Sequence, residues 1–205
     1  EFFSTHDTSQ LLNLMDSKNA KHTPKMQAAV ETRMRKELRW EDQSDLMWSY
    51  YWDLLVLARS KNLTSAGLDL SSAQKRRITR KGLAGIAPIE KKQIFSTDLS
   101  DPVYREHMTS IFKDVHCGMD HGKMADRLYD TWRARNDQMA LSIVHLHDSR
   151  PPGQGPVVII MGNGHTDYGL GVMDRVRHLN PKISQANLAM TEIFRKPVEL
   201  ETYLT

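Results

Sequence analysis

The residues best suited to chemistry lie in a glycine-rich segment, residues 162–171, which directly follows the apolar run 157–161. Its glycines permit backbone conformations with positive φ and let the chain approach a flat ligand closely. His165, Asp167 and Tyr168 supply groups that act as ligands or as acid and base. The segment has neither the Gly-x-Gly-x-x-Gly register nor a Gly-Lys-Ser/Thr ending, so nucleotide binding is not expected. The structural alternative is that the glycines serve turns and the aromatic ring packs under a helix.

A second group of donor side chains occupies residues 116–121, where two predicted helices meet. It contains His116, Cys117 and His121 within six positions. Because Cys117 is the single cysteine of the chain, the group matches no standard zinc spacing. A local metal site and a polar turn between helices are both open interpretations.

Amphipathic periodicity predicts a helix over residues 45–58, where apolar residues recur three and four apart. Ser71, followed three residues later by Gln74, forms a capping-box pattern that begins a helix running toward Gly82.

Two longer helices are predicted further along the chain. Asp101 before Pro102 supplies an N-cap and a first-turn proline for a helix that runs to residue 115, and residues 124–146 continue the same period. In this last helix Arg135 and Asn136 stand where an apolar residue is due, which indicates either a polar contact or a site.

Three segments are predicted as strands, namely residues 63–70, 157–161 and 183–190. The second is an uninterrupted apolar run, which is typical of a strand covered by helices on both faces. Because strands alternate with helices, the predicted fold class is α/β, with a mainly parallel sheet flanked by helices and a large helical insertion. Residues 1–205 are predicted to form a single domain.

Composition excludes several classes of protein. The 28 Lys and Arg against 25 Asp and Glu leave a net charge of only +3, so a nucleic-acid partner is not expected. No apolar run approaches the roughly 18 residues of a transmembrane helix. One cysteine excludes an internal disulfide framework.

Four motifs resemble, in order, those of the ChaN-like haem-binding lipoproteins of bacterial iron acquisition. They are Arg39-Trp40-Glu41, residues 78–83, residues 136–140, and the Gly162-Asn163-Gly164-His165 run with Tyr168-Gly169. The resemblance implies a haem cofactor, with Tyr168 as axial ligand of the haem iron and His165 as a further candidate ligand. Asn163, Gly164 and Gly169 would complete the binding loop. A phenolate is a hard anionic donor suited to ferric iron.

The resemblance also implies a setting. Relatives of this kind look like homodimers on the periplasmic side of a bacterial membrane, held there by a lipid anchor. Their domain begins with a strand ending in a Gly-Glu-x-His motif that this sequence does not contain. We therefore expect the domain to be incomplete at its N-terminus, with that strand, an export signal and a lipidation cysteine preceding residue 1.

Basic and tryptophan side chains give weaker evidence for haem binding. The basic run Lys75, Arg76, Arg77, Arg80 and Lys81 could meet haem propionates or acidic lipid headgroups, but a solvated helix face is the favoured interpretation. Trp48, Trp52 and Trp132 could wall a porphyrin pocket or form ordinary core.

The sequence favours a haem carrier without turnover, so no catalytic residue is assigned. The alternative is a metal-dependent hydrolase in which His165 is a ligand or general base and works with upstream Glu and His residues. A third interpretation is a degenerate domain that only mediates contacts.

Overall fold

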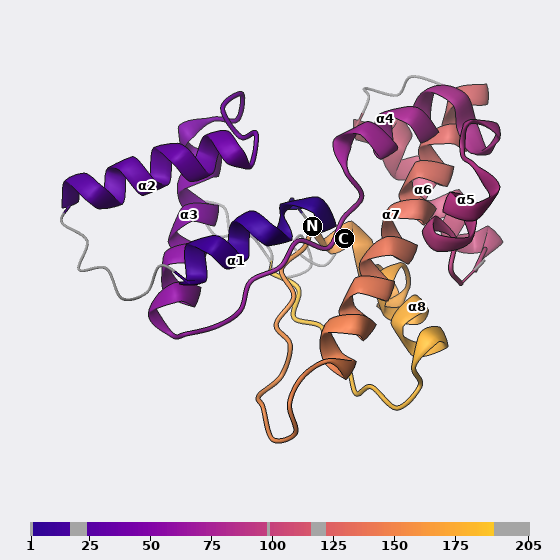
Figure 1. Ribbon diagram of the computed structural model, residues 1–205. Helices are drawn as coiled ribbons and strands as arrows, with labels where there is room; N and C mark the ends of the chain where they lie inside the picture. The colour runs from indigo at the N-terminus through magenta and orange to yellow at the C-terminus, as the bar shows by residue number, and fades with distance from the viewer. Residues whose placement is uncertain (1, 17–23, 98, 116–121, 191–205) are drawn as a thin grey trace, which may run out of the picture.

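The computed structural model describes residues 2–16, 24–97, 99–115 and 122–190 (Figure 1). Within these residues the backbone forms eight α-helices: α1 (Thr8–Asp16), α2 (Pro24–Glu37), α3 (Asp45–Ser60), α4 (Ser72–Lys81), α5 (Pro88–Ile94), α6 (Pro102–Val115), α7 (Lys123–Asp148) and α8 (Val172–Leu179). Short 3-10 helices are η1 (Thr5–Asp7), η3 (Gly82–Gly85), η4 (Asn163–His165) and η5 (Asp167–Gly169).

The helices form two groups. Figure 1 shows α1, α2 and α3 on the left and α4 to α8 on the right, where the long helix α7 is central. Helix α7 contacts α4, α5, α6 and α8. Each group has its own hydrophobic clusters: one is built from α1, α2 and α3 around Trp40 and Trp48, and three others surround α7.

Local signals explain where several helices begin. The Ser44 hydroxyl accepts a hydrogen bond from the Met47 amide at the start of α3. Ser71 and Gln74 form the predicted capping box at the start of α4, and Gly82 ends that helix with φ 63°. The Asp101 carboxylate accepts from the first amides of α6. The four helices predicted from the sequence are thus confirmed as α3, α4, α6 and α7.

The predicted α/β fold is wrong. The described residues contain no strand; they contain one isolated parallel bridge, between Ser4 and Asp69. Residues 157–161 are extended, yet they pack on helices: Ile159 and Met161 join the cluster of α7 and α8, while Val158 is 77% exposed. Helices can therefore bury one side of such a segment in place of a sheet, and in the described part of the chain the helices form the fold and are not an insertion into a sheet.

The junction between the two groups depends on close backbone contact. The Phe3 carbonyl accepts from the Leu68 amide at 2.9 Å, and the Thr5 amide donates to the Asp69 carbonyl at 3.0 Å. A Cβ atom on Gly67 would overlap the backbone of Ser4, so only glycine fits there. None of the helices in the described part of the chain is both long enough and apolar enough to cross a membrane.

Candidate functional site

The glycine-rich loop connects the extended segment 157–161 to α8 through two consecutive 3-10 turns. The His165 amide donates to the Gly162 carbonyl at 3.0 Å, and the Gly169 amide donates to the Thr166 carbonyl at 3.1 Å. Gly169 and Gly171 have φ values of 70° and 68°. A Cβ atom on Gly171 would overlap the His165 carbonyl, so glycine is required where α8 folds back against the loop.

His165 lies inside the protein and is 1% exposed. Its ring stacks on Trp132 of α7, with ring centroids 3.8 Å apart and an angle of 10° between the planes. Its Nδ1 lies 2.5 Å from Oδ1 of the buried Asn136. Because an amide oxygen only accepts, Nδ1 carries the proton in this assignment. His165 therefore holds the loop against α7.

Two aromatic side chains extend this support. Trp132 Nε1 donates to the Tyr104 hydroxyl at 3.0 Å, and the hydroxyl donates to the Gly164 carbonyl at 3.1 Å. Burial raises the pKa of Tyr104 above the ordinary value for tyrosine, which keeps the hydroxyl protonated as a donor. The predicted loop residue Gly164 thus serves through its backbone carbonyl, and a Cβ atom added to it would just touch the Trp132 ring.

Tyr168 differs sharply from His165, because its side chain is 80% exposed. Its backbone has φ 55°, which is uncommon for a residue with a side chain. The ring meets the edge of His107 from α6, with centroids 5.4 Å apart and planes at 78°. Nε2 of His107 is buried and has no hydrogen-bond partner among the described residues. The fold thus presents a phenol to solvent with an imidazole beside it.

His107 was not predicted as a site residue. It lies on the α6 helix, which the sequence predicted only as an amphipathic element, and no motif joins it to the glycine-rich loop. Only the packing of α6 against the loop brings His107 to Tyr168.

An apolar surface adjoins the same loop. The Asn163 side chain donates to the Met190 carbonyl at 3.3 Å, and the Asn187 side chain donates to the Thr166 carbonyl at 3.5 Å. These bonds hold the end of the described chain beside the loop, where Leu188 and Met190 are almost fully exposed. These two exposed apolar side chains beside the loop are candidates for contact with an apolar ligand.

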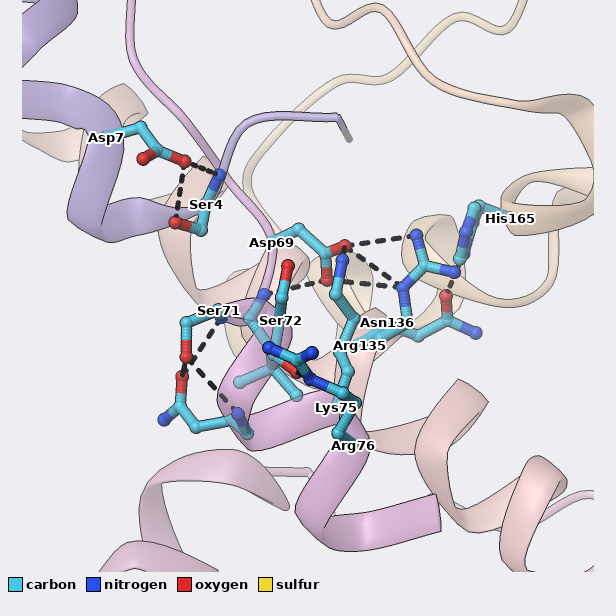
Figure 2. Close-up of polar contacts among 12 residues, drawn as sticks. Ser4, Asp7, Asp69, Ser71, Ser72, Lys75, Arg76, Arg135, Asn136 and His165 are labelled. Atoms are coloured by element: carbon cyan, nitrogen blue, oxygen red, sulfur yellow. Dashed lines mark hydrogen bonds and ion pairs between the residues drawn. The ribbon is translucent and has the colours of Figure 1, made fainter. Parts of the chain in front are cut away.

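The break in the apolar stripe of α7 is a polar contact. Figure 2 shows Arg135 and Asn136 with different partners: Arg135 contacts Asp69, and Asn136 contacts His165. Asp69 is fully buried, and its carboxylate lies 3.1 Å from Nη2 of Arg135 and 2.7 Å from Nζ of Lys75. A buried carboxylate is tolerated because two cations surround it. Neighbouring positions of α7 thus tie the glycine-rich loop to the junction of the two helix groups.

A second buried ion pair lies below the loop. Nε of Arg175 on α8 is 2.9 Å from a carboxylate oxygen of Asp137 on α7, and both side chains are buried. The Thr97 hydroxyl donates to the same carboxylate. Arg175 also donates to the carbonyls of Gly171 and Leu99. This pair joins α7 and α8 at the base of the loop.

Because Asp137 is buried, we expect its ionisation to make the free energy of unfolding depend on pH. Burial raises the pKa of Asp137 above the ordinary value for aspartate, although the Thr97 hydrogen bond and the Arg175 charge oppose the shift. The folded protein therefore holds this proton more tightly than the unfolded chain. As pH rises from the unfolded pKa of about 3.9 through the higher folded pKa, this residue's contribution to the free energy of unfolding falls.

Urea denaturation of the wild type and of Asp137→Asn, carried out at several acidic pH values, measures how the free energy of unfolding depends on this carboxyl group. The stability of the wild type relative to the variant should decrease with rising pH and become constant above the folded pKa. Asp114→Asn, at an exposed position on α6, controls for the change of charge. A relative stability that rises with pH would mean that the ion pair depresses the pKa, contrary to this expectation.

The remaining predicted residues are distributed over the structure. Trp48 and Trp52 stack on each other in the α1–α3 group, whereas Trp132 supports the loop. In the basic run, Arg77 pairs with Glu90 on α5, and Arg76 donates to the Ser72 carbonyl of its own helix.

The predicted donor group at residues 116–121 lies outside the described residues. Among the residues that are described, no three His, Cys, Asp or Glu side chains cluster as a metal site.

The fold and the loop together define a helical protein that holds an exposed tyrosine on a glycine-rich turn. The chain belongs to the family described as haem-binding uptake, Tiki superfamily, ChaN, whose model matches residues 1–176. The resemblance drawn from the four motifs is therefore confirmed, and the family is one of haem-binding uptake proteins. Comparison with curated proteins and with solved structures found no match.

Proposed function

We propose that the protein binds ferric haem in bacterial iron acquisition, with the Tyr168 phenolate as axial ligand and the glycine-rich loop as its support. The observation that carries the proposal is the contrast between two loop side chains: Tyr168 is 80% exposed, whereas His165 is 1% exposed and bonded to Asn136. Only the tyrosine can reach a bound iron without opening the loop.

The residues around Tyr168 suit a haem. A porphyrin needs an apolar surface for its face, and the exposed side chains of Leu188 and Met190 lie beside the loop. Bound haem supplies a ferric ion, which favours a hard anionic oxygen donor. Iron would bind the phenolate form of this side chain, and we assign the His107 imidazole, whose ring packs against the Tyr168 ring, as the group that assists binding.

The buried residues below the loop have a positioning role in this proposal. The loop backbone between η4 and α8 is held by contacts with three side chains: His165, Trp132 and Tyr104. Tyr168 therefore has its left-handed backbone conformation before the ligand binds. A site formed in advance loses less conformational entropy on binding. Asn163 and Gly169 contribute through the bonds and turns that shape the loop.

The alternative of a metal-dependent hydrolase that uses His165 draws no support from the geometry, because the imidazole is buried and hydrogen-bonded to Asn136. Attachment to the periplasmic side of a bacterial membrane through a lipid anchor belongs to the same proposal as haem uptake. The complete reading frame tests that part.

A hemin titration followed by absorption spectroscopy tests the proposed site. We expect saturable binding by the wild type, and we expect His107→Ala to weaken it by roughly tenfold, because an interaction with an ionised group contributes about 1.5 to 3 kcal/mol. His178→Ala, at an exposed position on α8, is the matched control and should bind as the wild type does. Equal affinities for all three proteins would remove His107 from the site, and no saturable binding by the wild type would refute the proposed function.

A further inference from the structure

Helix α3 has one buried face and one exposed apolar face. Trp48 and Leu55 are buried in the cluster that α3 forms with α1 and α2. On the other side four large apolar side chains are exposed, and we call them the α3 seam: Met47, Tyr50, Leu54 and Leu57. Tyr50 is 59% exposed and Leu57 53%. The fold therefore leaves a line of apolar side chains about 15 Å long on the surface of this helix.

The spacing of the α3 seam is typical of a helix that pairs with another helix. Its members are three, four and three residues apart, so they occupy alternate a and d positions of a heptad. Side chains at these positions fit between the side chains of a second helix that lies along the same line. Leu46, beside the seam, is 64% exposed and widens the apolar surface. An amphipathic helix is therefore the shape of partner that this surface fits.

The border of the seam is acidic. Asp53 occupies a g position of the heptad, where paired helices carry the charges that select a partner. It is exposed and has no ion pair or hydrogen bond with another side chain in the described part of the chain. Glu41 and Asp42 are exposed just before α3, and Lys61 is exposed just after it. Three carboxylates against one ammonium complement a partner that carries lysine or arginine beside its apolar face.

A second copy of this chain fits the α3 seam poorly. Two antiparallel α3 helices would bring their g positions together and place two Asp53 carboxylates side by side. Two parallel helices would place Asp53 opposite Ala58, at an e position, which offers no cation. Because like charges that face each other disfavour an interface, the charge pattern indicates a different chain with a cation at this place.

We propose that the α3 seam is a docking surface for an amphipathic helix of another protein, which presents apolar side chains at heptad spacing and a lysine or arginine to Asp53. Apolar contacts along the seam provide the affinity, and the charge beside it selects the partner and its register. The surface belongs to the α1–α3 group and does not involve the glycine-rich loop, so docking is independent of the proposed haem site.

A lipid surface also fits the α3 seam less well. Helices that lie in the membrane interface carry lysine and arginine around their apolar face, because anionic lipids attract them. Here the carboxylates of Glu41, Asp42 and Asp53 border the apolar side chains instead. An anionic bilayer would repel this border.

A synthetic helical peptide tests the surface. The probe has three heptads with Leu at a and d, Lys at e and g, and Ala elsewhere, and its lysines disfavour pairing of the peptide with itself. Fluorescence anisotropy of the labelled peptide with hemin-free protein should show saturable binding with a dissociation constant of roughly 10 to 100 μM, as a small interface predicts. A peptide with Glu in place of every Lys should bind at least about tenfold more weakly. No saturable binding of the lysine peptide, or equal binding of both peptides, would overturn the proposal.

Substitutions in the protein locate the contact. Leu57→Ser removes an apolar side chain of the seam and should weaken binding of the lysine peptide by about tenfold. Val56→Ser, at an exposed position outside the seam, is the matched control and should bind as the wild type does. Asp53→Asn should reduce the preference for the lysine peptide over the glutamate peptide. Circular dichroism checks that each variant keeps its helices. Equal affinities of Leu57→Ser and Val56→Ser, or an undiminished preference in Asp53→Asn, would contradict the proposed surface.

Two further measurements test the other occupants. Sedimentation velocity would assign the seam to a second copy if Leu57→Ser dissociated a dimer that the wild type and Val56→Ser both form. Flotation with phosphatidylcholine and phosphatidylglycerol vesicles would assign the seam to lipid if Leu57→Ser alone abolished it. We expect Leu57→Ser to behave as the wild type does in both measurements, and either assignment would overturn the proposal.

Discussion

Tyr168→Phe should lower hemin affinity by more than about a hundredfold, because replacing residues that merely support metal ligands already costs 10- to 100-fold. The substitution keeps the aromatic ring and its edge contact with His107 while it removes the oxygen that would bond iron. The charge-transfer absorption of a ferric phenolate should disappear. Since the side chain is 80% exposed, the free energy of unfolding should change by only about 0.5 kcal/mol or less.

Comparing the loss of hemin affinity in the Tyr168 and His165 variants shows which residue is the iron ligand and which one supports the loop. His165→Ala should weaken hemin binding less, by roughly ten- to a hundredfold, and should also destabilise the fold because it leaves a cavity beside Trp132. Tyr50→Phe, at an exposed tyrosine on α3, is the matched control for Tyr168→Phe and should bind hemin as the wild type does. An unchanged spectrum in Tyr168→Phe, with binding abolished in His165→Ala, would show that the ligand is the histidine and that the proposed site is wrong.

Arg175→Met should lower the free energy of unfolding by about 3 to 5 kcal/mol, because it leaves the Asp137 carboxylate buried without its cation. The substitution also removes the hydrogen bonds to the carbonyls of Gly171 and Leu99. Urea denaturation at neutral pH measures the loss. Arg177→Met, at an exposed position of the same helix, should change stability by no more than about 0.5 kcal/mol.

A double substitution shows how much of this loss of stability comes from the ion pair and how much from packing. Asp137→Asn with Arg175→Met removes both charges, so its loss should be smaller than the sum of the two single losses. Additive losses would mean that the two side chains act independently and that the buried pair does not determine stability.

Local patterns were sufficient to predict several helices. The Ser71 and Gln74 capping box, the Asp101 cap and the period of α7 depend on residues within one or two turns of each other, so they can be read before the chain folds. The expected strands failed for the complementary reason. An extended apolar run becomes a strand only through regular pairing with another segment, and residues 157–161 form no strand within the described chain, where Ile159 and Met161 pack on α7 and α8.

Part of the candidate site could also be predicted from the sequence, and part could not. Its composition of four glycines, a histidine and a tyrosine is evident in residues 162–171, and the motifs were specific enough to indicate the family now shown by the match over residues 1–176. Which donor faces solvent was not evident. His165 is buried because Trp132 and Asn136 stand on one face of α7 where the loop crosses it, and Tyr168 is exposed because its positive φ turns it outward.

The sequence by itself determined four of the eight described helices, the position of the loop and the family, because each depends on neighbouring residues or on motifs in order. Tertiary structure alone decided that Arg135 pairs with Asp69 and that His107 lies beside Tyr168. These are contacts between segments distant along the chain, and burial or pairing of a side chain depends on which segments the fold brings together.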